Sequence, residues 1–310
     1  MALPAHLWRR YRSPSVGIAR SIWELAREAA EGWLDHQASR TGAALAFYTV
    51  FSLAPVLTLS IAMAGFFFGE AAARGEIVGQ IAELIGPEGA RAVQAVLHNA
   101  NRTGGGFIAT IASVVTLFFG ASTALAELKS GLDQTWNVPL ERRQGFWYFV
   151  RTRLLTVGLI LALGFLLLVS LVISAALAAL GRMWRGEVLL DAVLAWINFL
   201  FAFVLVAALF ATIYKVLPSV RIAWRDVAIG SLVTAFLFTA GKFAIGVYIG
   251  NSGVASPYGA AGSIVLLLVW VYYSAQILLF GAEFTRVFTY RFGSRALDSV
   301  GLLRPATRTE

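Results

Sequence analysis

The sequence predicts an all-α polytopic membrane protein, a six-transmembrane-helix bundle with amphipathic outside helices between the first and second spans. Composition and the distribution of apolar residues lead to this prediction. Apolar residues make up 58% of the 310-residue chain and charged residues 14%, whereas charged residues make up about 25% of ordinary soluble domains. The chain has six long apolar runs, and a run of about eighteen residues can cross ~30 Å of hydrocarbon as a helix.

Basic residues are distributed unequally between alternate loops. The predicted spans are 43–68, 106–127, 153–180, 190–214, 226–250 and 258–287. Nineteen of the 25 lysines and arginines then lie on the side of the N-terminus and five on the other side, with Lys242 inside the fifth span. Because cytoplasmic loops carry the excess of basic residues, we expect both termini in the cytoplasm. The net charge of +8 thus orients the chain, and no nucleic-acid partner is needed to explain it.

Short segments flank the predicted transmembrane domain. We expect a flexible basic tail over 1–20, a cytoplasmic amphipathic helix over 21–42, the transmembrane domain over 43–292 and a cytoplasmic tail over 293–310. In the amphipathic segment Ile22, Leu25, Ala29 and Trp33 repeat at helical spacing and form an apolar face. We interpret it as a surface helix that positions the first span, with a docking site for a cytosolic partner as the alternative.

The outside loop over 69–105 has the pattern of two short amphipathic helices. The apolar face of the first contains Ile77, Ile81, Leu84 and Ile85, and that of the second contains Val93, Val96 and Leu97. Such a pair of helices could cap an outward-facing cavity or rest on lipid headgroups. The length of the loop favours the cap, because loops without such a task are usually shorter.

Polar residues inside the spans are the candidate binding residues. A charge at the centre of the hydrocarbon costs at least ~2.5–3.5 kcal/mol, so Lys242 requires a reason. It either contacts Asn198 at similar depth and lines a polar cavity, or extends its long side chain outward to the interface. Tyr272 and Gln276 share one face of the sixth span and are assigned to the same cavity. Pro55 predicts a kink in the first span and is also assigned to the candidate cavity.

A second polar group lies near the cytoplasmic ends of the second and sixth spans. Counting residue depth at 1.5 Å per residue pairs Glu127 with Arg286 and Glu283 with Lys129. These four residues form a predicted cytoplasmic-side network. The network could simply lock the two spans together, or it could act as an inner gate.

Four stretches of the chain resemble the YihY/BrkB family of bacterial inner-membrane proteins. They are ALAFYTVFSLAPVL (44–57), ELKSGLDQTWNV (127–138), LPSVRIAWRDVAIGSLVTAFLFTAGKFAIGVYIG (217–250) and SPYGAAGSIVLLLVWVYYSAQILLFGAEFTRV (256–287). The resemblance implies six helices, an inner-membrane location and cytoplasmic termini. Members carry labels such as virulence factor, serum-resistance factor or ribonuclease BN, and no agreed catalytic set transfers to this chain. The matched stretches contain Glu127, Lys129, Asp133, Lys242, Tyr272, Gln276 and Glu283.

The residues themselves argue against catalysis. Metal-dependent phosphodiester cleavage needs clustered histidines and carboxylates, but His6, His36 and His98 show no ligand spacing, and the third is predicted across the membrane from the others. The chain has no cysteine and no phosphate-binding G-x-x-x-x-G-K-[ST] loop. We therefore expect no enzyme activity, no metal and no cofactor, and consider a ribonuclease role poorly supported.

Two function classes remain after this exclusion. The first is a transporter or flippase of a lipid or anionic amphiphile, because a single cation in an apolar chamber suits such a substrate better than a hydrophilic solute. The alternative is a non-catalytic membrane scaffold for envelope assembly. The expected partners are membrane lipids, with other envelope proteins or a second copy of the chain as alternatives.

Overall fold

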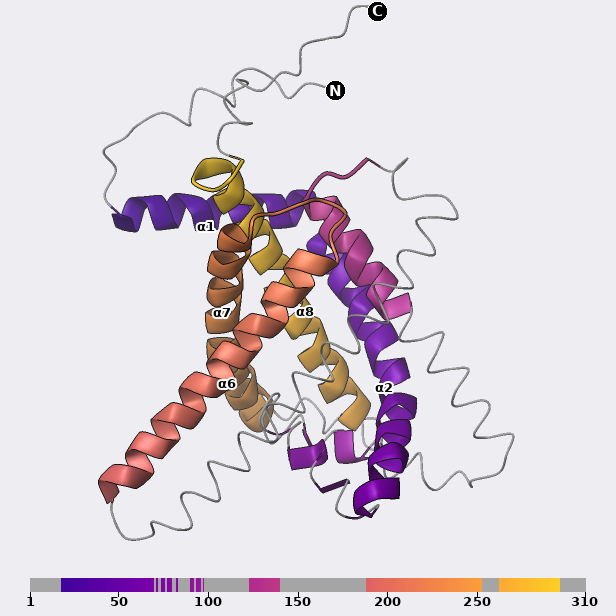
Figure 1. The fold of residues 1–310 in the computed structure, drawn as a ribbon. Coiled ribbons are helices and arrows are strands. Elements are labelled where there is room, and N and C mark those ends of the chain that lie inside the picture. The colour runs from indigo at the N-terminus through magenta and orange to yellow at the C-terminus, as the bar shows by residue number, and fades with distance from the viewer. Residues whose placement is uncertain are drawn as a thin grey trace, which may run out of the picture.

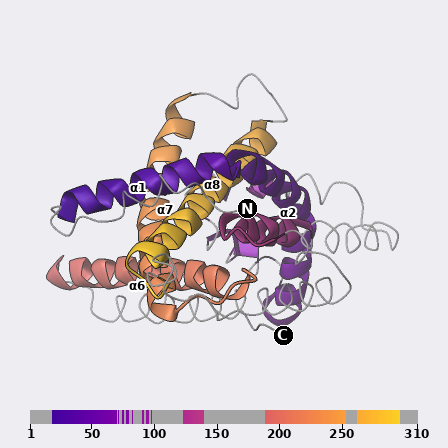
Figure 2. The same cartoon turned by 90° about the horizontal axis from the view of Figure 1, so that it is seen from above.

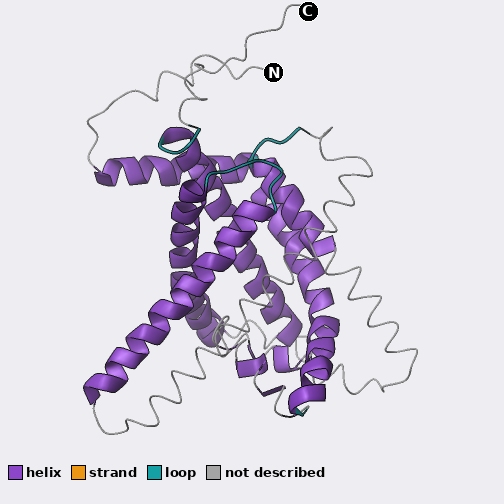
Figure 3. Cartoon of the chain, viewed as in Figure 1, coloured by secondary structure: helices purple, strands orange, loops and turns teal. Residues whose placement is uncertain are grey.

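The computed structural model describes five long helices and several shorter pieces. The described residues are 18–69, 71, 74, 75, 77–79, 82, 90, 91, 93–95, 97, 123–139, 188–252 and 262–295. The long helices are α1 (Ile18–Asp35), α2 (Ala38–Phe68), α6 (Val188–Val216), α7 (Trp224–Ser252) and α8 (Gly262–Arg291) (Figure 1). Residues 123–135 are also helical. Every regular element in this described part is a helix (Figure 3), in agreement with the predicted all-α class.

Helix α8 lies at the centre of the arrangement. It contacts α1, α2 and α7, and α6 packs on α7. Helix α1 lies across one end of the bundle, where α6 and α8 end and α7 begins (Figures 1 and 2). We call this the α1 end, and it corresponds to the side predicted to be cytoplasmic.

Three helices in the described part of the chain are long and apolar enough to cross a membrane. The qualifying segments are Trp196–Val216, Trp224–Tyr248 and Ile264–Arg291, with mean hydropathies of 2.3, 1.6 and 2.1. They correspond to the spans expected over 190–214, 226–250 and 258–287. The expected first span lies within α2. The expected span 153–180 and most of 106–127 lie outside the described residues, so the count of six remains a prediction.

The boundary between α1 and α2 differs from the expected one at residue 42. Helix α1 ends at Asp35 and α2 begins at Ala38, because Gln37 adopts a left-handed φ of 50°. The His36 amide still donates to the Gly32 carbonyl at 2.9 Å, and the Gln37 amide donates to the Leu34 carbonyl at 3.0 Å. A two-residue turn therefore joins the surface helix directly to the long helix.

The apolar face of α1 packs against α8 rather than lying wholly on lipid. Leu25 and Ala29 are buried in a cluster with Phe284 and Val287 of α8. Ile22, which was expected on the same face, is 57% exposed. The buried face is thus narrower than the sequence pattern suggested.

The helix assignment of α2 continues through Pro55. The Ser52 hydroxyl, one turn earlier, donates to the Thr49 carbonyl at 3.0 Å. The proline side chain lies outside the described side chains, and the kink at this position remains a prediction.

Small residues allow α6, α7 and α8 to meet closely. The Tyr214 hydroxyl of α6 donates to the Leu278 carbonyl of α8 at 2.7 Å and lies 3.1 Å from the Thr234 hydroxyl of α7. Gly281 leaves the space for this junction, because a Cβ there would overlap the Thr234 hydroxyl and lie 2.5 Å from the Tyr214 oxygen. Gly230 of α7 provides the same close approach to Thr285 of α8.

The described residues of the outside loop pack against protein. Val93 and Leu97 are 1% and 3% exposed and share a cluster with Leu57 and Ile61 of α2 and Leu267 of α8. This segment lies at the end of the bundle opposite α1 (Figure 1). Burial in protein favours the cap interpretation over a segment resting on headgroups alone. The two amphipathic helices remain a prediction, because several of their apolar residues lie outside the described part.

Candidate functional site

Gln276 places a buried, unpaired amide in the contact between α2 and α8. Both its Nε2 and its Oε1 are buried and have no hydrogen-bond partner among the described residues. The amide lies directly against Gly42 of α2, where an added Cβ would overlap Nε2. At 1.5 Å per residue, Gln276 is about 18 Å along α8 from Ile264. The amide therefore lies within the predicted sixth span, level with the cytoplasmic start of the predicted first span.

An unpaired amide at this depth is costly. Leaving a buried donor or acceptor unsatisfied costs about 1–3 kcal/mol, and native proteins contain few such groups. A polar group kept at this cost within a span is a functional-site candidate. Tyr272, expected beside it in the cavity, is 37% exposed and lies one turn further from the α1 end.

Two further predicted cavity residues, Lys242 and Asn198, lie on different helices. Lys242 of α7 is half-buried, and its Nζ is 5.6 Å from the ring centroid of Phe243. Asn198 lies on the exposed half of α6, whereas residues 207–214 of α6 supply that helix's buried side chains. These positions do not establish the predicted Lys242–Asn198 contact, which remains a prediction.

A buried carboxylate of α8 holds the end of α1 and the turn that follows it, at the α1 end. Glu283, 1% exposed, receives a hydrogen bond from His36 Nδ1 at 2.6 Å on one oxygen. Its other oxygen accepts from Arg286 Nε and Nη2, each at 2.9 Å. Gly32 of α1 lies over this pair, since a Cβ there would be 2.6 Å from Arg286 and 2.7 Å from Glu283. On its other side, His36 Nε2 is 3.3 Å from Asn137 Oδ1.

Estimating the depth of each residue from its position in the sequence identified part of this cluster. It placed Glu283 and Arg286 together in one network, and the structure brings them together as neighbours on α8. His36 was missed as a partner of Glu283, because 247 residues separate the two in sequence. The sequence does carry one signal for this contact. A histidine follows directly after the predicted surface helix and lies next to the start of a span, where it can reach the end of another span.

The His36–Glu283 contact is expected to make stability depend on pH. The hydrogen bond to Glu283 raises the pKa of His36 above its ordinary value of 6.5, and partial burial of the ring opposes this rise. A raised pKa in the folded state means that the protonated form stabilises the fold. This contribution is fully present below about pH 6.5 and is lost as the pH rises through the folded-state pKa.

Thermal unfolding measured from pH 5.5 to 8.5 tests this expectation. The wild type should lose melting temperature across that range more steeply than His36→Asn, which keeps a polar side chain but cannot be protonated. Parallel curves for the two proteins would contradict the assignment.

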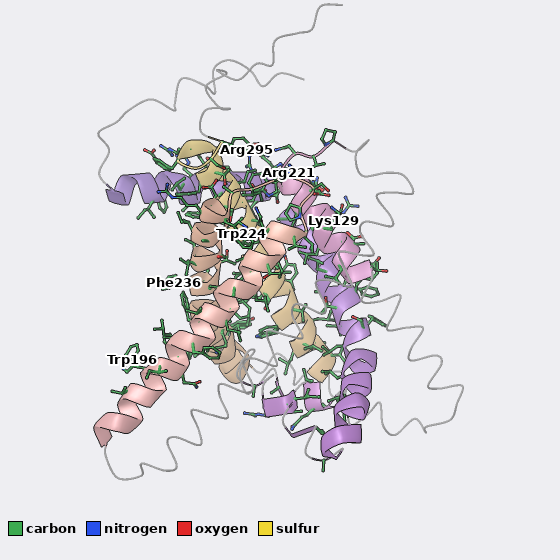
Figure 4. All side chains as sticks on the ribbon, viewed as in Figure 1. Lys129, Trp196, Arg221, Trp224, Phe236 and Arg295 are labelled. Atoms are coloured by element: carbon green, nitrogen blue, oxygen red, sulfur yellow. The ribbon has the colours of Figure 1, made fainter. Side chains whose placement is uncertain are left out.

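Lys129 belongs to a separate buried cluster. It donates to Asp133 Oδ2 at 3.0 Å, to the Ser219 hydroxyl at 2.7 Å and to the Leu217 carbonyl at 3.1 Å. Asp133 also accepts from the Ser219 amide at 2.6 Å. The Lys129 and Asp133 side chains are 2% and 0% exposed. This cluster ties the helix 123–135 (Figure 4) to the connection between α6 and α7.

The predicted pairing of the cytoplasmic-side residues therefore needs correction. Lys129 pairs with Asp133 on its own helix, whereas Glu283 pairs with His36 and Arg286. Glu127 is half-buried on the Lys129 helix. Depth arithmetic failed because it places residues along the membrane normal and says nothing about which helices are neighbours.

Two further clusters hold the α1 end together. The buried Asp226 at the start of α7 accepts from the amide and the hydroxyl of Ser294, at 2.9 and 2.7 Å. Arg291 near the end of α8 pairs with Glu24 of α1 at 2.5 Å and with Glu28 at 3.4 Å. Both clusters thus lie at the α1 end, together with the Glu283 cluster.

The described residues contain no group of three or more histidines, cysteines, aspartates or glutamates that could hold a metal ion. Their polar clusters are instead carboxylates satisfied by arginine, lysine, histidine and serine. This chemistry joins helices to one another.

A chain whose helices are apolar enough to cross a bilayer, held by buried ion pairs at one end, is a helical membrane protein. It belongs to the virulence factor BrkB family, whose model matches residues 29–299. This confirms the family resemblance of the sequence. No solved structure matches the chain.

Several curated relatives carry the name UPF0761 membrane protein. The relative in Alkalilimnicola ehrlichii is 27% identical over 248 residues, covering 80% of this chain and 54% of that protein. The relative in Klebsiella pneumoniae is 35% identical over 159 residues, covering 51% of this chain and 52% of that protein. The relative in Pseudomonas aeruginosa is 26% identical over 261 residues, covering 84% and 61%. The chain thus spans about half to three fifths of the length of these relatives, whose names state a membrane protein and no reaction.

Proposed function

We propose that this protein moves a lipid or another anionic amphiphile across the bacterial inner membrane and thereby contributes to envelope integrity. The observation that carries the proposal is the buried Gln276 amide, which is hydrogen-bonded to nothing in the described part of the chain. A polar headgroup that passes Gln276 would form hydrogen bonds with the amide. This transient binding would explain why the chain keeps an unpaired buried amide despite its energetic cost.

Lys242 on the adjacent helix α7 indicates the charge of the substrate. The half-buried Lys242 lies on α7, and α8, which carries Gln276, contacts both α7 and α2. One cation among apolar helices favours an anionic headgroup attached to an apolar body. The ion-pair clusters at the α1 end would close the path on the cytoplasmic side in this conformation.

A reconstituted translocation assay with Gln276→Met tests the proposal. Purified protein is placed in liposomes that contain a headgroup-labelled anionic phospholipid, and dithionite quenching reports label that reaches the outer leaflet. Methionine keeps the length of the side chain and removes the amide. We expect translocation to slow about tenfold, in line with the loss of one buried hydrogen bond to the substrate. Lys242→Met should slow the transport of anionic lipid as well.

Ser274→Ala is the matched control, because the Ser274 hydroxyl donates only to a carbonyl of its own helix, that of Trp270 at 2.9 Å. Gln276→Met should also be more stable than wild type, since it removes an unsatisfied buried group. Unchanged translocation in Gln276→Met and Lys242→Met would reject the proposed path. The scaffold alternative predicts instead that changes in 21–39 or 70–101 do more harm, and that a stoichiometric partner co-purifies.

A further inference from the structure

Three basic residues lie where α6 ends and α7 begins, at the α1 end. Lys215 lies in the last turn of α6, and Arg221 and Arg225 are exposed on either side of the start of α7. Trp224, the first residue of α7, is 63% exposed. The Lys215 ammonium is 5.2 Å from the centroid of the Trp224 ring. Basic and aromatic side chains together at the ends of two spans are typical of a membrane interface.

Acidic residues do not neutralise this basic surface. Asp226 is the only acidic residue between Asp191 and Glu283 in the sequence. Its carboxylate is 1% exposed and is directed at Ser294, from which it accepts two hydrogen bonds. The surface formed by Lys215, Arg221 and Arg225 is therefore positive.

An exposed apolar stripe runs along α7 below this surface. Four residues follow Arg225 at distances of 7, 11, 18 and 22 positions. At 3.6 residues per turn they lie on the same helix face, within about 60° of each other. These residues are Leu232, Phe236, Phe243 and Val247, with exposures of 47%, 65%, 62% and 64%. The end of α7 with Trp224 and the position of Phe236 lower on the helix are shown in Figure 4. One face of a single helix thus combines a basic end with a long apolar surface.

The spacing on this face matches the shape of a phospholipid. Leu232 lies about 10 Å and Phe236 about 16 Å below Arg225 along the helix axis. Half of the ~30 Å hydrocarbon layer corresponds to one leaflet, so both apolar residues lie at the depth of an acyl chain whose headgroup is at Arg225.

We propose that this α7 face binds an anionic phospholipid of the cytoplasmic leaflet. Arg221 and Arg225 bind the headgroup phosphate, for which guanidinium groups are well suited. Trp224 lies beside the headgroup, one residue before Arg225, and an acyl chain follows Leu232 and Phe236. This site goes beyond the proposed transport and does not depend on it, because a lipid held here is a bound ligand whether or not any lipid crosses the membrane.

Lipid binding to the purified full chain tests the proposal. Native mass spectrometry in detergent measures the affinity for phosphatidylglycerol and for phosphatidylcholine in the wild type and in Arg221→Gln/Arg225→Gln. Each basic residue near an anionic surface contributes about a fivefold gain in affinity. We therefore expect the double variant to bind phosphatidylglycerol on the order of twentyfold more weakly, with little change for phosphatidylcholine. Each single variant should lie between these values.

The matched control is Arg27→Gln/Arg40→Gln, which removes the same charge from exposed positions on α1 and α2. It should bind phosphatidylglycerol as the wild type does. An equal loss in the control would show a general charge effect, and an unchanged affinity in the Arg221/Arg225 variant would show no site; either result overturns the proposal. Crosslinking between copies through Phe236, with no preference for phosphatidylglycerol, would assign the stripe to self-association instead.

Discussion

Lys129→Met is expected to lower the free energy of unfolding by about 3–5 kcal/mol, because it leaves the Asp133 carboxylate buried without its cation. Both side chains are almost completely buried, so solvent cannot replace the ammonium. The Ser219 amide and hydroxyl would remain as the donors to Asp133, and two neutral donors do not compensate a buried charge. Equilibrium unfolding in mixed micelles measures the effect.

Arg27→Gln provides a control with the same spacing. Arg27 and Glu31 also form an i,i+4 pair, at 2.9 Å, but their side chains are 62% and 58% exposed. Such an exposed pair contributes at most about 0.5 kcal/mol. The double variant Lys129→Met/Asp133→Leu should recover much of the loss, because it leaves no unpaired buried charge. If Lys129→Met lost no more stability than Arg27→Gln, the buried cluster would not hold the helix 123–135 in place.

Gly281→Ala is expected to destabilise the protein by about 2–4 kcal/mol. An added Cβ would overlap the Thr234 hydroxyl and crowd the Tyr214 oxygen. Over-packing costs about 1–3 kcal/mol, and displacing Tyr214 from the Leu278 carbonyl loses a buried hydrogen bond of about 1 kcal/mol. The added methyl group should push α8 away from α6 and α7. The resulting loss of stability is measured as a lower melting temperature in detergent.

Gly246→Ala makes the same chemical change at an open position. No atom lies within 4 Å of a Cβ at Gly246, so the exchange should stabilise α7 by about 0.5–1 kcal/mol through helix propensity. Combining Gly281→Ala with Thr234→Ala should recover part of the loss, because it removes the overlapping hydroxyl. Equal effects of the two glycine exchanges would contradict a tight junction at Gly281.

Apolar runs predicted the helices of this protein well where the pattern is long. The windows that define α6, α7 and α8 need only length and hydropathy, and both can be read from the sequence. The end of α1 could not be predicted in this way. It depends on the left-handed φ of Gln37, a residue type that gives no strong signal for that conformation.

The partners of the polar residues were predicted less well than the residues themselves. Glu283, Lys129 and Gln276 were all identified as polar groups within or near spans. Their contacts depend on which helices are neighbours, and the sequence pattern carries no such information for helices that are uniformly apolar. His36 reaches Glu283 only because α1 crosses the end of α8. Gly42 and Gly281, which admit Gln276 and Thr234, resemble any other glycine in a membrane helix.

The proposed lipid transport is tested most directly by measuring translocation by the wild-type protein at increasing protein-to-lipid ratios. Dithionite quenching of a headgroup-labelled phospholipid should rise above the outer-leaflet share, in proportion to the fraction of liposomes that contain protein. Quenching that stays at the outer-leaflet share at every ratio, with protein shown to be folded by its melting transition, would contradict the claim and favour the scaffold.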